Sequence, residues 1–260
     1  MLEIKPNTKQ QECIDNIDGK YLVLAGPGTG KTFTIIQRIK AMLERGIDRS
    51  KILCLTFTDA AANEMKVRLE KELNTLSIDV NIFTYHGFCC NVIDENIEEF
   101  EFPQSYRIMS DSVSRAFIKE CIDEINPKYF RTEKNDPYFY IDTIKRRIDE
   151  IKKNRLSKGD YFKNIEFNPD WQPELDSLIA ELEAKHKKGE TRVKTLTGNI
   201  ETQQKKIDQA KELWEFYELY QAKMEKNHYI DYNDMINSVL AKFESNPAFL
   251  EKIANQYEYI

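Results

Sequence analysis

A glycine-rich stretch near the N-terminus has the residue types and spacing needed to bind phosphate groups. It reads Ala25-Gly26-Pro27-Gly28-Thr29-Gly30-Lys31-Thr32. An apolar run at 21–24 precedes it and a helical apolar pattern follows it, which predicts a strand, a glycine loop and a helix. Backbone N–H groups of such a loop, with those of the helix N-terminus, form a positively polarised concave surface. Lys31 would reach the β- and γ-phosphates of a nucleotide, and Thr32 would offer its hydroxyl to Mg²⁺.

The first position of this loop departs from the usual motif. Ala25 stands where the motif has glycine, so the match rests on the Gly-Lys-Thr end and on the flanking elements. The alternative is an ordinary glycine turn between a strand and a helix. A Lys-Thr pair has no role in such a turn, which favours the phosphate loop. We therefore expect ATP and Mg²⁺ as cofactors, with Lys31 and Thr32 as catalytic residues and Thr32 as the metal ligand.

The elements around the loop alternate between strands and helices. Residues 51–57 and 80–83 are predicted to be buried strands, and a helix at 59–73 separates them. A short helix capped by Asn7 or Thr8 precedes the glycine loop. Strands that alternate with helices imply right-handed crossovers and a mainly parallel sheet. The sequence therefore predicts an α/β fold.

From about residue 106 the alternation stops, and residues 109–228 are predicted to be an inserted, all-helical subdomain. Its helices are predicted at 110–125, 141–151, 175–182 and 200–224. Ser110 is the expected cap of the first of them. The last two are expected to form a hairpin with its tip at 185–194, although no motif assigns a role to the charged stretch 165–205.

The strand-helix pattern returns at 229–260. Asp231 is the expected N-cap of one helix, a second begins at Asn246, and residues 257–260 have the composition of a strand. The helical subdomain therefore interrupts an α/β domain built from residues 1–108 and 229–260.

Composition limits the cellular setting. No run reaches the ~20 apolar residues of a membrane span, and the N-terminus lacks the apolar core of a signal peptide, so we expect a cytoplasmic protein without a membrane partner. Five cysteines without a C-x-x-C pair favour reduced thiols over disulfides or zinc. The net charge of −6 means that any nucleic-acid site must be local. A basic cluster within 145–158 is best interpreted as a solvated helix face, with a nucleic-acid patch as the alternative.

Four stretches together distinguish among the classes of phosphate-loop protein. They are, in order, Asn7-x-x-Gln10, residues 25–32, Thr56-Phe57-Thr58-x-x-Ala61-Ala62-x-Glu64-Met65-x-x-Arg68, and Thr84-Tyr85-His86-Gly87-Phe88. Their order and spacing resemble the UvrD/Rep family of superfamily 1 DNA helicases. The likeness runs from the first residues to about 125 and again from about 210 to 260.

This resemblance implies a RecA-like phosphate-loop domain in an ATP-dependent DNA helicase. Members of the family translocate along single-stranded DNA, usually 3′ to 5′, act at duplex junctions, and clamp ATP between this domain and a second RecA-like domain. The expected roles lie in DNA repair, replication or recombination. By motif position, Gln10 resembles the residue that reads the adenine edge, and Arg38 lies where the family places an arginine near the nucleotide. The alternative for Gln10 is an exposed helix residue.

The resemblance also assigns the DNA contacts, which follow two strand ends. Thr56 and Thr58 would bond phosphate or sugar, and Phe57 would stack on a base. Thr84 and His86 resemble the next DNA-contact motif. The alternatives are that Phe57 belongs to the core and that His86 is structural.

Asp231-x-x-Asp234 resembles a further family motif. Helix capping and the helix dipole explain both carboxylates, so we interpret them as structural. The resemblance also places Ile260 just before the Asp-Glu pair (Walker B) that would hold Mg²⁺. The sequence is therefore expected to be an N-terminal fragment, with little ATP turnover by itself.

Two rival functions remain open. One is a helicase subunit of a helicase-nuclease or anti-phage system, which a nuclease domain further along a longer chain would indicate. The other is a DNA-binding module that ATP gates without unwinding. Strand-displacement assays on the full-length protein would separate the second rival from a helicase.

Overall fold

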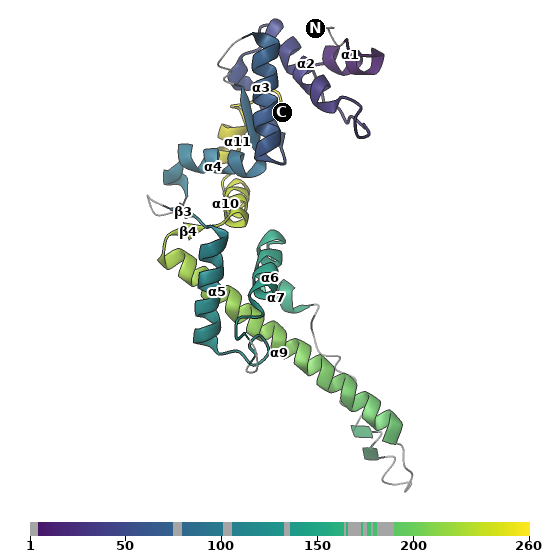
Figure 1. Ribbon diagram of the computed structural model, residues 1–260, viewed down its shortest axis with the longest axis vertical. Coiled ribbons are helices and arrows are strands. Elements are labelled where there is room, and N and C mark those ends of the chain that lie inside the picture. Colours follow the sequence, from purple (N-terminus) through teal and green to yellow (C-terminus); the bar gives the residue numbers. More distant parts are fainter. Residues whose placement is uncertain are drawn as a thin grey trace. The chain divides into compact units, whose positions relative to one another are not determined.

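The computed structural model describes residues 5–74, 80–100, 106–132, 136–163, 165 and 190–260, and a few positions between 173 and 180. Figure 1 shows its helices and strands. Contacts divide the chain into two compact units. The first unit comprises Met1–Glu101 and Ser238–Ile260, and the second comprises Phe102–Asn237. The domain boundaries predicted from the sequence, at 108/109 and 228/229, remain predictions.

The first unit is a mixed α/β structure. Its elements are α1 (Thr8–Asp15), α2 (Lys31–Glu44), the 3-10 turn η1 (Arg49–Lys51), β1 (Leu53–Thr56), α3 (Asp59–Leu73), β2 (Asn81–Thr84), α4 (Tyr85–Glu95), the 3-10 turn η2 (Ile97–Glu99) and α11 (Pro247–Ala254). Helix α10 (Tyr232–Ser245) begins in the second unit and ends in the first. The predicted strands at 51–57 and 80–83 and the helix at 59–73 are thus confirmed to within a few residues.

The sheet of the first unit is small and parallel. Strands β1 and β2 pair in parallel register, with Leu53 opposite Asn81 and Thr56 opposite Thr84. The predicted strand at 257–260 is reduced to one parallel bridge between Ile52 and Tyr259. Apolar side chains of α2 and α3 pack on the strands and form one core, which includes Ile36, Ile39, Met65, Leu69 and Ile82.

The strand predicted at 21–24 is wrong. These residues have no regular secondary structure, and Leu22 and Leu24 are 86% and 87% exposed. A strand is stabilised by a paired neighbour and a covered face more than by its own composition. In the described part of the chain the β1–β2 sheet does not extend to this run, so its apolar side chains stay in solvent.

The second unit is built on three helices. They are α5 (Asp111–Ile125), α6 (Ile141–Lys153) and the 37-residue α9 (Glu190–Lys226), with the short α7 (Lys158–Lys163) beside them. Their inward faces share a core that includes Phe117, Ile118, Ile122, Ile144, Ile148 and Phe216. Within this unit α9 extends well past α5 and α6 (Figure 1). The first two predicted helices and the long last helix are confirmed.

Two features of this unit differ from the prediction or lie beyond it. A two-residue parallel pair, β3 (Arg107–Ile108) with β4 (Tyr229–Ile230), flanks the helices just outside the predicted limits 109–228. Half of the predicted helix at 175–182 lies outside the described residues, and its described positions are helical. Residues 185–189 of the predicted hairpin tip also lie outside the described residues. Residues 190–194 are not a tip but belong to α9, which begins at Glu190 and not near Ile200 as predicted. None of the helices in the described part of the chain has the length and apolarity needed to cross a membrane.

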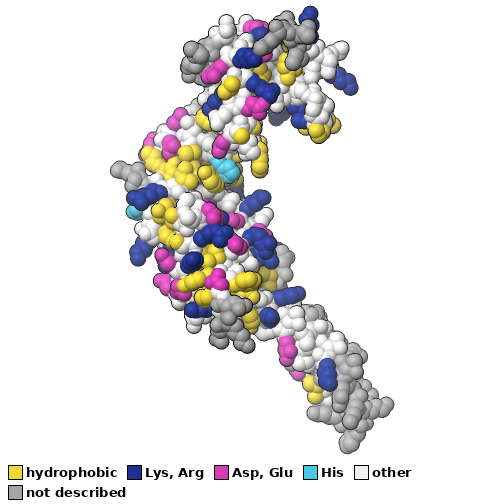
Figure 2. Space-filling model, in the orientation of Figure 1, with side chains coloured by type: hydrophobic (Ala, Val, Ile, Leu, Met, Phe, Trp, Pro, Cys, Tyr) yellow, Lys and Arg dark blue, Asp and Glu magenta, His cyan; other side chains and the backbone are white. Residues whose placement is uncertain are grey.

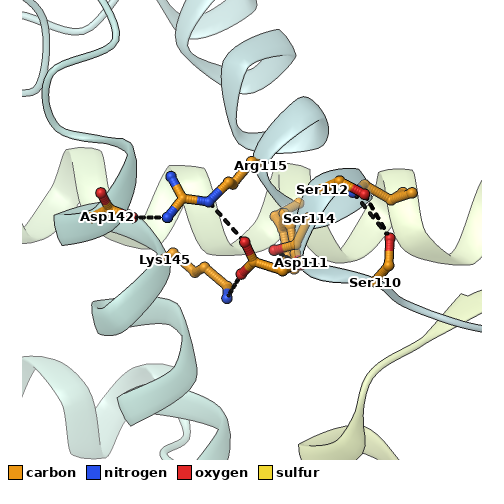
Figure 3. Close-up of polar contacts among 9 residues, drawn as sticks. Ser110, Asp111, Ser112, Ser114, Arg115, Asp142 and Lys145 are labelled. Atoms are coloured by element: carbon orange, nitrogen blue, oxygen red, sulfur yellow. Dashed lines mark hydrogen bonds and ion pairs between the residues drawn. The ribbon is translucent and has the colours of Figure 1, made fainter.

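Charged side chains join the start of α5 to α6 (Figure 3). Ser110 caps α5 as predicted, by accepting from Val113 N at 3.3 Å. Asp111 accepts hydrogen bonds from Lys145 and from Arg115, whose Nε lies 2.9 Å away. These two cations hold the pKa of the Asp111 carboxyl below its usual range, and the hydrogen bond from Lys145 has the larger effect.

The basic cluster within 145–158 is largely paired with acids. The pairs are Lys145 with Asp111, Arg147 with Glu150, Lys152 with Asp231 and Asp234, and Lys158 with Glu218. Figure 2 accordingly shows the Lys and Arg side chains of this unit interspersed with Asp and Glu. This pairing supports a structural interpretation of the cluster over a nucleic-acid patch.

Lys152 is the most unusual member of that cluster because its side chain is only 1% exposed. Its ammonium contacts Asp231 and lies 2.8 Å from an oxygen of Asp234, with the Tyr220 ring 5.2 Å away. Asp231 also accepts from Asp234 N at 2.9 Å, which caps α10 as predicted. Burial raises the pKa of Asp234 and outweighs the nearby ammonium. The Asp231-x-x-Asp234 motif therefore serves capping and charge pairing.

Candidate nucleotide and DNA sites

The glycine loop ends in a helix N-terminus that no side chain caps. Gly30 is the N-cap of α2 and has a φ of 83°, which favours glycine. A Cβ at Gly30 would lie 2.9 Å from Nε2 of Gln10. By contrast, α1, α3 and α4 are capped by the side chains of Asn7, Thr58 and Thr84. The first N–H groups of α2 thus keep their capacity to bind an anion.

The side chains of the loop bring a positive charge to this helix start. The exposed Lys31 donates through Nζ to the carbonyl oxygens of Gly26, at 2.8 Å, and Ala25, at 3.3 Å. Thr29 Oγ1 donates to the same Gly26 oxygen at 2.8 Å. Thr32 is half-buried in the first turn of α2. An ammonium beside a helix start that no side chain caps fits a phosphate ligand.

The loop turns at Pro27 and Gly28, next to a glutamine from α1. Gln10 Nε2 donates to the Thr29 carbonyl oxygen at 3.0 Å, while its Oε1 accepts from Asn7 N at 2.9 Å. Both ends of the Gln10 amide are therefore engaged beside the loop. Reading an adenine edge would require exchange of these two bonds, which are partly open to solvent.

Arg38 is anchored away from the loop, at the C-terminal end of α1. Its guanidinium donates to the carbonyl oxygens of Cys13, Asn16 and Ile17, the last at 2.8 Å. It also lies 5.5 Å from the centre of the Tyr21 ring. These bonds satisfy carbonyl groups at and just beyond the C-terminal end of α1, and they tie that helix to α2. A nucleotide contact by Arg38 stays a prediction, and it would have to compete with them.

The two predicted DNA stretches meet at one edge of the sheet. Thr56 and Thr84 are register partners at the carboxyl ends of parallel strands. Phe57 follows Thr56 and is 87% exposed, so its assignment to the core is wrong. Thr58 is exposed and caps α3 by accepting from Ala61 N at 3.2 Å, which leaves its O–H free to donate.

The second stretch is partly committed to structure. Thr84 is 6% exposed and caps α4 by accepting from Gly87 N at 3.0 Å. His86 is half-buried in the first turn of α4. Tyr85, between them, is 56% exposed and was not among the predicted site residues. The signal that could have found it is its place directly after a strand end, like that of Phe57.

Comparisons with known proteins identify a family. The family model described as UvrD/REP helicase N-terminal domain matches residues 6–260. A protein named ATP-dependent DNA helicase PcrA from Bacillus subtilis (strain 168) is 30% identical over 98% of this chain. Proteins of the same name from Leuconostoc citreum and Staphylococcus aureus (strain Mu50 / ATCC 700699) are 25% and 23% identical over 98%. The chain spans 28% of the length of each of these relatives.

Proposed function

The chain belongs to the UvrD/REP helicase family, and from this premise we propose that it forms the ATP- and single-stranded-DNA-binding front part of an ATP-dependent DNA helicase. The observation that carries the proposal is the uncapped start of α2 at Gly30, with the Lys31 ammonium on the same loop. The family implies a RecA-like fold, in which ligands bind at the carboxyl ends of parallel strands.

For the nucleotide site, we propose that residues 25–32 hold the phosphates of ATP. Lys31 exchanges the Gly26 and Ala25 carbonyl oxygens for the β- and γ-phosphates, because an anion is a stronger partner for an ammonium than a carbonyl is. Thr32 supplies a hydroxyl to Mg²⁺, which when bound would neutralise charge on the phosphates. Gln10 recognises the adenine edge, since an amide offers both a donor and an acceptor.

For the DNA site, we propose that one strand crosses the ends of β1 and β2. Phe57 stacks on a base, and Thr56, Thr58 and His86 contact the backbone, while Thr84 orders the turn. In the whole protein a second RecA-like domain completes the clamp. ATP turnover there drives 3′ to 5′ movement toward duplex junctions, in cytoplasmic DNA repair, replication or recombination.

Replacing Phe57 with alanine tests the DNA site. We expect the chain to bind oligo-dT weakly and in a salt-dependent manner. Loss of one stacked base at ~1–3 kcal/mol should weaken this binding by about 5- to 150-fold. Fluorescence anisotropy with labelled oligo-dT at low salt measures the change.

The matched control is Val67→Ala, which removes an exposed apolar side chain from α3 in the same unit. It should bind oligo-dT like the unchanged chain. If Phe57→Ala kept its thermal stability and also bound like the unchanged chain, the stacking role would be refuted.

A further inference from the structure

Two exposed aromatic rings leave neighbouring strand ends at the same level. Phe57 and Tyr85 each follow one member of the Thr56–Thr84 register pair. Adjacent strands lie ~4.8 Å apart, and the carboxyl ends of parallel strands face the same edge. The two residues therefore leave the sheet side by side, one 87% and the other 56% exposed.

The exposure of Tyr85 is unusual for its place in α4. Cys89 and Val92, one and two turns further along the same helical stripe, are 8% and 1% exposed and pack inward. The residues on this face of α4 are therefore buried except for the first, Tyr85, which lies just beyond the end of the sheet. A core role predicts a covered ring, whereas a ring that binds a flat ligand must keep a face in solvent.

The backbone that carries Tyr85 is held in place. Thr84 Oγ1 accepts from Gly87 N at 3.0 Å and closes the first turn of α4 around Tyr85. A Cβ at Gly87 would come within 3.2 Å of that oxygen, so glycine allows the close approach. A fixed backbone limits the freedom that the ring loses on binding.

We propose that Tyr85 is a second base-stacking residue for single-stranded DNA, beside Phe57. This inference rests on the DNA site of the proposed function and adds a contact by Tyr85, to which the motif resemblance assigns no role. Two aromatic rings on adjacent strand ends can each cover a base of one strand. Every base has a π-face, so the contact is indifferent to sequence.

The test compares Tyr85→Leu, Tyr85→Phe and Phe57→Ala on two probes, oligo-dT and an abasic oligonucleotide of equal length. Leucine keeps apolar cover over the helix start but has no ring, whereas phenylalanine keeps the ring. We expect Tyr85→Leu to bind oligo-dT at least ~5-fold more weakly and the abasic probe without change. Tyr85→Phe should match the unchanged chain on both probes.

Every other outcome refutes either the stacking role of Tyr85 alone or the whole proposed DNA site. If Phe57→Ala loses affinity for oligo-dT and Tyr85→Leu does not, the second stacking residue is wrong and the DNA site stands. If Tyr85→Leu weakens both probes equally, or Tyr85→Phe weakens oligo-dT binding, the ring is not stacking and the inference fails. If neither Phe57→Ala nor Tyr85→Leu changes binding, or the unchanged chain does not bind oligo-dT, the proposed DNA site fails as well.

Discussion

Replacing Lys31 with alanine is expected to abolish measurable ATP binding while leaving the first unit folded. The ammonium is the positive side chain of the glycine loop, and charge-assisted hydrogen bonds of this kind contribute ~1.5–3 kcal/mol each. Loss of contacts to two phosphates should therefore weaken binding by about 100-fold or more. Isothermal titration calorimetry with ATP and Mg²⁺ measures the loss.

The fold should survive this change because Lys31 is exposed and bonds only loop carbonyls. Exposed substitutions of this kind alter the free energy of unfolding by about 0.5 kcal/mol or less. Lys40→Ala is the matched control, since Lys40 lies on the same helix and pairs weakly with Glu72 at 3.8 Å. If Lys31→Ala and Lys40→Ala bound ATP with equal affinity, the glycine loop would not be part of the nucleotide site.

Replacing Lys152 with methionine is expected to lower the free energy of unfolding more than any other substitution proposed for this chain. The change keeps an unbranched side chain of similar length but leaves the carboxylates of Asp231 and Asp234 without their buried cation. Breaking a buried ion pair from one side costs ~3–5 kcal/mol. Urea unfolding followed by tryptophan fluorescence reports the loss, because one of the two tryptophans, Trp214, is buried in the second unit.

The loss of stability in Lys152→Met should become smaller as the pH falls. Burial already raises the pKa of Asp234, and removal of Lys152 should raise it further. A carboxyl whose pKa is higher in the folded state costs stability as the pH rises through the range between its unfolded and folded pKa values. The variant should therefore recover stability as the pH falls toward ~4, relative to the unchanged chain.

A neutral triad provides the control for Lys152→Met. Adding Asp231→Asn and Asp234→Asn removes the unpaired charges, and asparagine still caps α10. This triple variant should regain most of the lost stability. A triple variant as unstable as Lys152→Met, or a loss below about 1 kcal/mol in the single variant, would mean that unpaired buried carboxylates are not the cause of the instability.

Local signals in the sequence predict much of the fold. Asn7, Ser110, Asp231 and Asn246 all cap helices at the expected places, because a cap depends on residues within one turn. The run at 21–24 fails as a strand because pairing depends on distant parts of a chain. The ion triad at Lys152 was also beyond sequence reasoning, since it joins residues about 80 positions apart.

In the candidate site, too, local features could be predicted from the sequence and features that depend on distant residues could not. The glycine loop was predicted from its own residues, and the parallel register places Thr56 and Thr84, the strand ends before Phe57 and Tyr85, at one edge of the sheet. The sequence could not show that Arg38 bonds the end of α1 or that Thr84 is a buried cap, because both follow from packing. Tyr85 was missed because the resemblance assigns DNA contacts in this stretch only to Thr84 and His86.

Hydrogen exchange of backbone amides tests the central claim most directly, because it locates two ligands on one chain. ADP with Mg²⁺ should slow exchange at residues 28–33, where the loop meets α2, and leave residues 57–60 and 85–88 unchanged. Oligo-dT should slow exchange at the latter two segments and leave the loop unchanged. Protection of the same segment by both ligands, or protection by ADP confined to regions outside the loop, would contradict the account.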